Sequence, residues 1–220
     1  MKFRVIAVVF ILALPVFFYL FVTSGHHRFR YLQYFGPKQP FQKTENGKQV
    51  SDTIYHTVSD ISVKNLKGET VSFQKYNPTY WVISFFNTQC KETCTKVFSN
   101  LQGEIQKDYK GVDKVKIISI TTNPVADSVS VLKRFEIQNG ILFNRWMLCL
   151  ADSLMVDSLM QQSFFMKTGT DLSLENVFLV DPDKHIRGIY DGTDVMEIRR
   201  LKDEIKVLSY EYKQKQEGKK

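Results

Sequence analysis

The sequence predicts an α/β protein in which a central mixed sheet is flanked by helices. Apolar runs rich in aromatic and β-branched residues, which are typical of buried strands, lie at residues 80–86, 114–121, 145–150 and 177–180. Between these runs, apolar residues recur at helical spacing at residues 90–109, 127–138 and 152–164. Strands and helices that alternate in this way are typical of a layered α/β fold.

The strand at 80–86 leads directly into two cysteines, Cys90 and Cys94. Apolar residues at helical spacing follow from Val97 to Ile105, so Cys90 is expected near a strand-to-helix turn and Cys94 one turn further on the same face. A thiol near the positive end of a helix dipole loses its proton more readily. The pair therefore predicts one of two activities, either dithiol/disulfide cycling or binding of a soft metal such as Cu(I).

Two hairpins and a last helix complete the order of elements. One hairpin is expected at residues 60–73, and another turns from the strand at 177–180 into residues 186–190. The last helix begins with a capping box at Asp194 and carries an apolar stripe to Leu208. With the cysteine pair at the first strand-to-helix turn, this order predicts a sandwich of the thioredoxin type.

Charge and cysteine content exclude several classes of protein. The chain of 220 residues has a formal net charge of +7, with much of the excess at its two ends. No basic stripe interleaved with aromatic residues lies inside the domain, so we expect no nucleic-acid partner. Three cysteines are too few for a disulfide scaffold and leave no second pair for a zinc site. Cys149, between two leucines, is expected to be a buried and inert thiol.

Residues 5–25 contain no charged residue and are long enough to cross a bilayer, which takes about 20 apolar residues. A cleaved signal peptide is the alternative, but the run is longer than a usual signal core and no clear cleavage site precedes Gly25. We expect residues 1–25 to be an uncleaved, single-pass signal anchor in a bacterial cytoplasmic membrane. The soluble part is then expected on the periplasmic side, because a short basic head usually stays inside.

The rest of the chain divides into three expected parts. Residues 26–55 are polar and aromatic with Gly-Pro and Gln-Pro breaks, and they are expected to be a linker that lifts the domain off the membrane. The thioredoxin-like domain is expected at residues 56–212, which is an ordinary size for one domain. Residues 213–220 are expected to be a charged tail.

Four segments match a known family. They are Phe85-Phe86-Asn87-Thr88-Gln89-Cys90-Lys91-Glu92-Thr93-Cys94, Ile118–Pro124 with Asp127-Ser128, Phe178–Pro182, and Arg187–Thr193. On these segments the chain resembles the Sco/SenC family of thioredoxin-like, membrane-anchored proteins over roughly residues 60–208. The resemblance implies delivery of copper to the Cu(A) site of cytochrome c oxidase, or reduction of the cysteines there. It also implies a copper site formed by the two cysteines and one histidine.

The chain departs from this family at the histidine. The ligand should lie eight residues before Asp181, and that position is Ser173. No histidine occurs between His56 and His185, and His185 lies in a predicted hairpin turn. The thioether of Met166, in the loop that should carry the histidine, could replace it as a soft ligand, although a methionine there is more often a core residue.

Two hypotheses about function therefore remain open. In the first, the chain is a thiol–disulfide oxidoreductase in which Cys90 attacks and Cys94 resolves. In the second, it is a Cu(I) metallochaperone that binds copper through Cys90 and Cys94. Both imply an envelope cuproprotein as client, such as a cytochrome c oxidase subunit, and membrane attachment through residues 5–25. The first also needs a thiol electron donor. A divergent family member that acts mainly as an assembly partner is a third, weaker alternative.

Overall fold

The computed structural model describes residues 13–17, 31–45, 48–109, 112–141, 145–167 and 174–218. The chain divides into two units, Met1–Tyr31 and Leu32–Lys220. Apart from residues 13–17, the anchor expected at 5–25 lies outside the described residues. Among the helices that are described, none combines the length and apolar character needed to span a bilayer.

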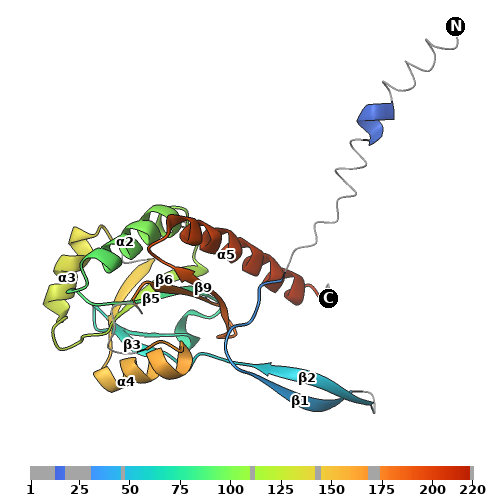
Figure 1. The fold of residues 1–220 in the computed structure, drawn as a ribbon, viewed down its shortest axis with the longest axis horizontal. Helices are drawn as coiled ribbons and strands as arrows, with labels where there is room; N and C mark the ends of the chain where they lie inside the picture. The colour runs from blue at the N-terminus through green and yellow to red at the C-terminus, as the bar shows by residue number, and fades with distance from the viewer. Residues whose placement is uncertain are drawn as a thin grey trace, which may run out of the picture. The chain divides into compact units, whose positions relative to one another are not determined.

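In the second unit, the described strands include a mixed sheet of seven strands (Figure 1). Its order is β4 (Thr70–Ser72), β3 (Ser62–Asn65), β7 (Trp146–Leu150), β6 (Val115–Thr121), β5 (Tyr80–Phe86), β8 (Asn176–Val180) and β9 (Ile186–Asp191). The inner strands β5, β6 and β7 run parallel, whereas the pairs at both edges are antiparallel. The mixed central sheet predicted from the sequence is confirmed.

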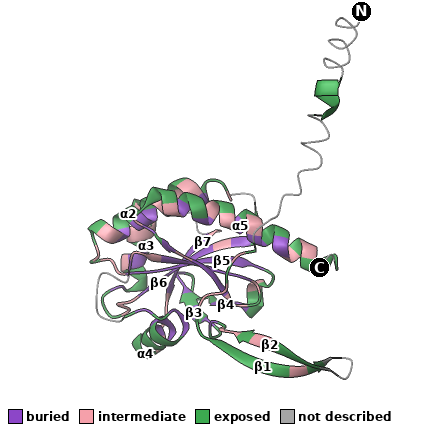
Figure 2. Ribbon diagram, turned by 45° about the vertical axis from the view of Figure 1, so that its right-hand side comes forward, coloured by how far each residue is buried: buried purple, intermediate pink, exposed green. Residues whose placement is uncertain are grey.

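Helices cover both faces of this sheet. They are α2 (Glu92–Leu101), α3 (Val129–Gln138), α4 (Ser153–Ser158) and α5 (Val195–Gln216), with a short 3-10 helix, η1 (Gln74–Tyr76), and two π-helical segments, η2 (Gln102–Gln106) and η3 (Leu159–Ser163). The helices α2 and α5 are in contact on one face, and α4 lies on the opposite face (Figure 1). Figure 2 shows that the sheet is buried and that the helices expose their outer sides.

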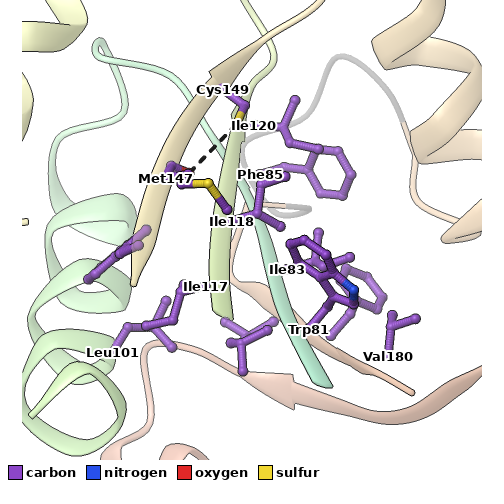
Figure 3. Packing of buried hydrophobic residues seen from close by; sticks show 14 of the residues in the cluster. Trp81, Ile83, Phe85, Leu101, Ile117, Ile118, Ile120, Met147, Cys149 and Val180 are labelled. Atoms are coloured by element: carbon purple, nitrogen blue, oxygen red, sulfur yellow. Dashed lines mark hydrogen bonds between the residues drawn. The ribbon is translucent and has the colours of Figure 1, made fainter. Parts of the chain in front are cut away.

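All residues of the central strand β5 are buried, and because successive side chains point to opposite faces of the sheet, both faces must be covered. Phe86 packs against Phe98 of α2, with ring centroids 5.2 Å apart. Phe85 packs against Phe164, which follows η3, at 5.4 Å. Figure 3 shows Phe85 in a row with Trp81 and Ile83 along the strand. The strand that leads to the cysteines is therefore fixed from two directions.

One polar residue inside β5, Ser84, has partners in the next two strands. The Ser84 and Ser119 hydroxyls are 2.7 Å apart, and the Trp146 indole N–H donates to Ser119 Oγ at 2.8 Å. A buried hydroxyl without a partner is costly, so this chain of hydrogen bonds is what makes a serine acceptable in the core. It also ties β5, β6 and β7 together.

Part of the expected linker is a β-hairpin. Strands β1 (Lys38–Glu45) and β2 (Lys48–Tyr55) pair antiparallel in a separate two-stranded sheet. The sequence pointed to a linker because proline usually ends a strand. Here Pro40 lies opposite Thr53 in a two-stranded sheet, in which both strands are edges. An edge strand tolerates a residue without an N–H.

The chain just before the hairpin is attached to the domain by a buried arginine. The Arg187 guanidinium donates to Leu32 O at 2.8 Å and to Gln33 O at 3.3 Å. It also bonds Glu211 at 2.6 Å and Asp181 at 3.2 Å, and all three charged side chains are buried. The body of the second unit therefore includes residues 32–33, well before the boundary at 56 expected from the sequence.

Candidate functional site

The two cysteines lie where β5 ends and α2 begins, as the sequence predicts. The strand ends at Phe86 and the helix begins at Glu92, so Cys90 lies just before the helix and Cys94 lies in its first turn. A disulfide joins the two residues, with Cα atoms 5.6 Å apart. The site is at the carboxyl end of a parallel strand, the usual place for reactive groups in α/β sheets.

The two sulfur-bearing residues differ in their access to solvent. Cys90 is half-buried, whereas only 1% of the surface of Cys94 is exposed. An incoming thiol or disulfide would therefore meet Cys90 first. The role of Cys90 as the attacking residue and of Cys94 as the resolving residue stays a prediction.

Backbone N–H groups make the hydrogen bonds at Cys90 and in the turn before it. The Cys94 N–H donates to Cys90 Sγ at 3.2 Å. The Cys90 N–H itself donates to Asn87 Oδ1 at 2.8 Å, and the Gln89 N–H donates to the same oxygen at 3.1 Å. When the disulfide is reduced, a hydrogen bond from the first helical turn to Sγ would stabilise a thiolate on Cys90.

A buried carboxylate lies below the loop that leads to Cys90. Asp127 is fully buried, and the Thr88 N–H donates to its two oxygens at 3.3 and 3.2 Å. The Thr88 and Thr121 hydroxyls also donate to this carboxylate. Asp127 therefore joins the loop after β5 to the loop after β6.

No site role was predicted from the sequence for Asn87, Thr88 or Asp127. Two signals were available. Asn87 directly follows a buried strand, where asparagine often accepts hydrogen bonds from the backbone of its own turn. Asp127 follows the next parallel strand, and the carboxyl ends of parallel strands meet at one edge of a sheet. Neither signal identifies the contact partner, because the partner lies on another loop.

The third cysteine lies apart from the pair. Cys149 is fully buried in β7, where its neighbour across the sheet is Ile120 of β6. Its Sγ is 3.9 Å from the Met147 carbonyl oxygen, the contact drawn in Figure 3. Burial raises the pKa of the Cys149 thiol well above its ordinary value. The chemistry of this residue is that of the inert thiol expected from its leucine neighbours.

The other candidate ligands have structural contacts. Met166 is 6% exposed and belongs to the hydrophobic core. His185 lies in the turn before β9, and its Nδ1 is 2.8 Å from the His56 carbonyl oxygen. That turn follows β8, whose Val180 pairs with Trp81 near the start of β5. The turn therefore lies at the opposite end of the strands from the cysteines, which follow the end of β5.

The donor atoms at the site are two sulfurs. Within the described parts of the chain, no group of three or more His, Cys, Asp or Glu residues is arranged to hold a metal ion. Position 173, where the resemblance places the histidine, lies outside the described residues. Two thiolates suit Cu(I), which accepts soft ligands and low coordination numbers.

A family model matches part of this chain. The SCO1/SenC model matches residues 49–140, which include both cysteines and Asp127. The SCO1 protein homolog of Bacillus subtilis (strain 168) is 27% identical over 101 residues, or 46% of this chain and 52% of the relative. The match thus spans about half the length of that curated relative.

Solved structures share the fold of the second unit. BsSco, a member of the Sco family of cytochrome c oxidase assembly proteins in which a disulfide switch was identified, gives a TM-score of 0.61 at 22% identity, covering 70% of this chain and 94% of that chain. Arabidopsis thaliana ScoI with copper bound gives 0.53 at 16% identity, covering 68% and 95%. At these identities the likeness shows the fold, and the predicted thioredoxin-like α/β architecture is confirmed.

Proposed function

We propose that this chain belongs to the SCO1/SenC family, whose model matches residues 49–140, and that it assists the assembly of a copper site, as in cytochrome c oxidase, by thiol–disulfide exchange. The observation that carries this proposal is the Cys90–Cys94 disulfide at the end of the central strand, with one cysteine accessible and one buried. The disulfide switch of BsSco, a relative with the same fold, supports it.

The exchange needs the reduced form of the pair. A Cys90 thiolate attacks one sulfur of a client disulfide, forms a mixed disulfide and releases one client thiolate. The Cys94 thiolate then attacks Cys90 Sγ, which releases the second client thiolate and closes the Cys90–Cys94 disulfide. The client gains two electrons and the chain loses two. A thiol electron donor must then reduce the disulfide again.

Copper delivery is the second candidate function, and the closeness of the two sulfurs supports it. Both thiolates could hold Cu(I) as cargo in a linear arrangement, while Cu(II) favours an additional imidazole. Copper-bound structures of the Arabidopsis and yeast relatives favour this candidate. Disulfide formation and copper binding exclude each other in one molecule, because both use the same sulfur atoms.

The membrane anchor and the location belong to the same proposal. The uncharged run at residues 5–25 supports a single-pass anchor, with the thioredoxin-like unit on the periplasmic side of a bacterial cytoplasmic membrane. A periplasmic location suits a thiol pair that reacts with client disulfides, because disulfides persist outside the cytoplasm.

One experiment separates the two functions. The full-length chain, purified in detergent, is reduced and titrated with Cu(I) and with Cu(II), and its disulfide is equilibrated in parallel with glutathione. We expect the disulfide to form and exchange in wild type and in Cys149→Ala, whereas Cys90→Ala cannot form it. Tight, stoichiometric copper binding that Cys90→Ala abolishes would instead favour the metallochaperone. A pair that fails to exchange with glutathione would contradict the proposed reaction.

A further inference from the structure

We propose that Asp127 is a positioning residue for the cysteine pair. Its buried carboxylate holds the loop that carries Cys90, and in this way it favours the closed Cys90–Cys94 disulfide over the open dithiol. This inference rests on the proposed thiol–disulfide function, and it names a residue that shifts the equilibrium between the dithiol and the disulfide. Asp127 acts through Thr88 and is given no direct contact with the client.

The contacts of Asp127 converge from two loops. Its carboxylate accepts the Thr88 N–H at 3.3 and 3.2 Å, and it also accepts the Thr88 and Thr121 hydroxyls. The Thr121 hydroxyl oxygen in turn accepts the Asn123 N–H at 3.1 Å. The carboxylate is thus the shared acceptor that fixes the loop after β5 against the loop after β6.

Asp127 differs from the other buried carboxylates of the described chain. Asp181 and Glu211 both pair with the Arg187 guanidinium, which offsets the cost of burying their charges. Among the ion pairs of the described residues, none includes Asp127, and its donors are hydroxyls and an N–H. Asp127 is thus held by neutral donors alone, and removing one of them would leave a buried carboxylate oxygen short of a hydrogen bond.

The path from Asp127 to the sulfur is short. Thr88 lies two residues before Cys90, and Asn87 on its other side accepts the Cys90 N–H through both its side-chain and backbone oxygens, at 2.8 and 3.2 Å. The Thr122 N–H donates to Phe86 O at 2.8 Å, so the start of the loop is also fixed. A change that loosens the backbone at Thr88 would therefore also loosen the position of Cys90.

The direction of the effect follows from effective concentration. A disulfide forms more readily when its two thiols are held close together in the reduced chain. Cys94 is fixed in α2, so the placement of Cys90 depends on its loop. Loosening this loop lowers the effective concentration of one thiol at the other, and the reduced form gains relative to the disulfide.

The test measures the equilibrium of the disulfide with glutathione in the full-length chain. Asp127→Asn replaces one acceptor oxygen by a donor, and Thr88→Val removes one hydroxyl from the same contact. We expect each variant to lower the equilibrium constant for disulfide formation about tenfold, which corresponds to a reduction potential about 30 mV more positive. Thr88→Ser keeps the hydroxyl, so its equilibrium constant should stay within about twofold of wild type.

Asp181→Asn is the matched control, because it changes a buried carboxylate at the end of the strands opposite to the cysteine pair. It should lower the free energy of unfolding and leave the glutathione equilibrium unchanged. The inference would be overturned if Thr88→Val and folded Asp127→Asn both had the same equilibrium constant as wild type. If Asp127→Asn does not fold, the comparison of Thr88→Val with Thr88→Ser decides. A wild-type pair that does not exchange at all would instead overturn the proposed function, and this inference with it.

Discussion

At the scale of single residues, the site depends on an asymmetry between two sulfurs. Cys90 is accessible and its sulfur accepts an N–H from the helix, whereas Cys94 is buried in the first turn of α2. Accessibility and thiolate stabilisation both favour attack by Cys90. Burial of Cys94 protects it from outside thiols, so its natural reaction partner is Cys90.

This asymmetry is testable with single serine variants. In reduced Cys94→Ser, Cys90 can attack oxidised glutathione but nothing resolves the product, so we expect a mixed disulfide to accumulate. In reduced Cys90→Ser, the buried Cys94 should form the adduct at least about tenfold more slowly. Intact-protein mass spectrometry over time measures both adducts. Equal rates in the two variants would contradict the assigned roles.

The buried serines of the core make a second prediction at this scale. Ser119→Ala leaves the Ser84 hydroxyl and the Trp146 indole N–H without their partner. Each unsatisfied buried group costs about 1–3 kcal/mol, so we expect the loss of both hydrogen bonds to lower the free energy of unfolding by about 2–6 kcal/mol. Urea unfolding provides the measurement. Ser158→Ala, at an exposed position, is the control and should change stability by less than about 0.5 kcal/mol.

At the scale of elements, the cysteine helix is held against the last helix. Beyond α2 and η2, the Tyr109 hydroxyl donates to Lys202 O of α5 at 2.8 Å. Lys202 also pairs with Glu104 at 2.7 Å, and Arg199 pairs with the same carboxylate at 2.9 Å. These contacts hold the segment after α2, the helix that carries Cys94, against α5.

Tyr109 predicts a pH dependence of stability. Burial raises its pKa to about 12, compared with about 10 in an unfolded chain. The Tyr109 hydroxyl therefore holds its proton more tightly in the folded state than in the unfolded state. The resulting contribution to folding stability is complete below about pH 10 and is lost as the pH rises through about 12. We expect Tyr109→Phe to reduce the loss of stability between about pH 10 and 12, measured by urea unfolding. An identical loss in wild type and variant would contradict this role.

The elements show what a sequence can and cannot predict. The strand at 80–86, its helix and the cysteine turn were predictable because each follows from local periodicity and burial. The hairpin of β1 and β2 was not, because Gly-Pro and Gln-Pro breaks are typical of linkers and only pairing reveals an edge strand. Asp127 was not assigned because its partners, Thr88 and Thr121, are distant in sequence and their contact depends on the fold.

At the scale of the whole molecule, the buried charge cluster sets where the second unit begins. Arg187 holds the Leu32 and Gln33 carbonyls, Glu211 accepts the Leu32 N–H at 2.5 Å, and the guanidinium lies 4.2 Å from the centroid of the Tyr34 ring. The residues before the hairpin therefore cover charges that would otherwise lack part of their hydrogen bonding. Sequence patterns could not show this, because the segment has no periodicity of its own.

Truncation tests this boundary. A chain that begins at residue 56 loses the two carbonyl acceptors of Arg187 and the aromatic face beside it, whereas a chain that begins at residue 32 keeps them. Because hydrogen bonds to charged groups each contribute about 1.5–3 kcal/mol, we expect the shorter chain to be less stable by roughly 3 kcal/mol. Thermal and urea unfolding compare the two. Equal stability would show that the segment before residue 56 is dispensable for the fold.

The burial of Cys149 away from the pair limits how many electrons one molecule can transfer before a donor reduces it again. Its thiol is buried in β7, hydrogen-bonds to Met147 O and has a raised pKa, so it neither attacks the Cys90–Cys94 bond nor stores a further electron. Each reduced molecule thus carries a single load of two electrons. Under the proposed reaction, each further client therefore requires one further encounter with the electron donor.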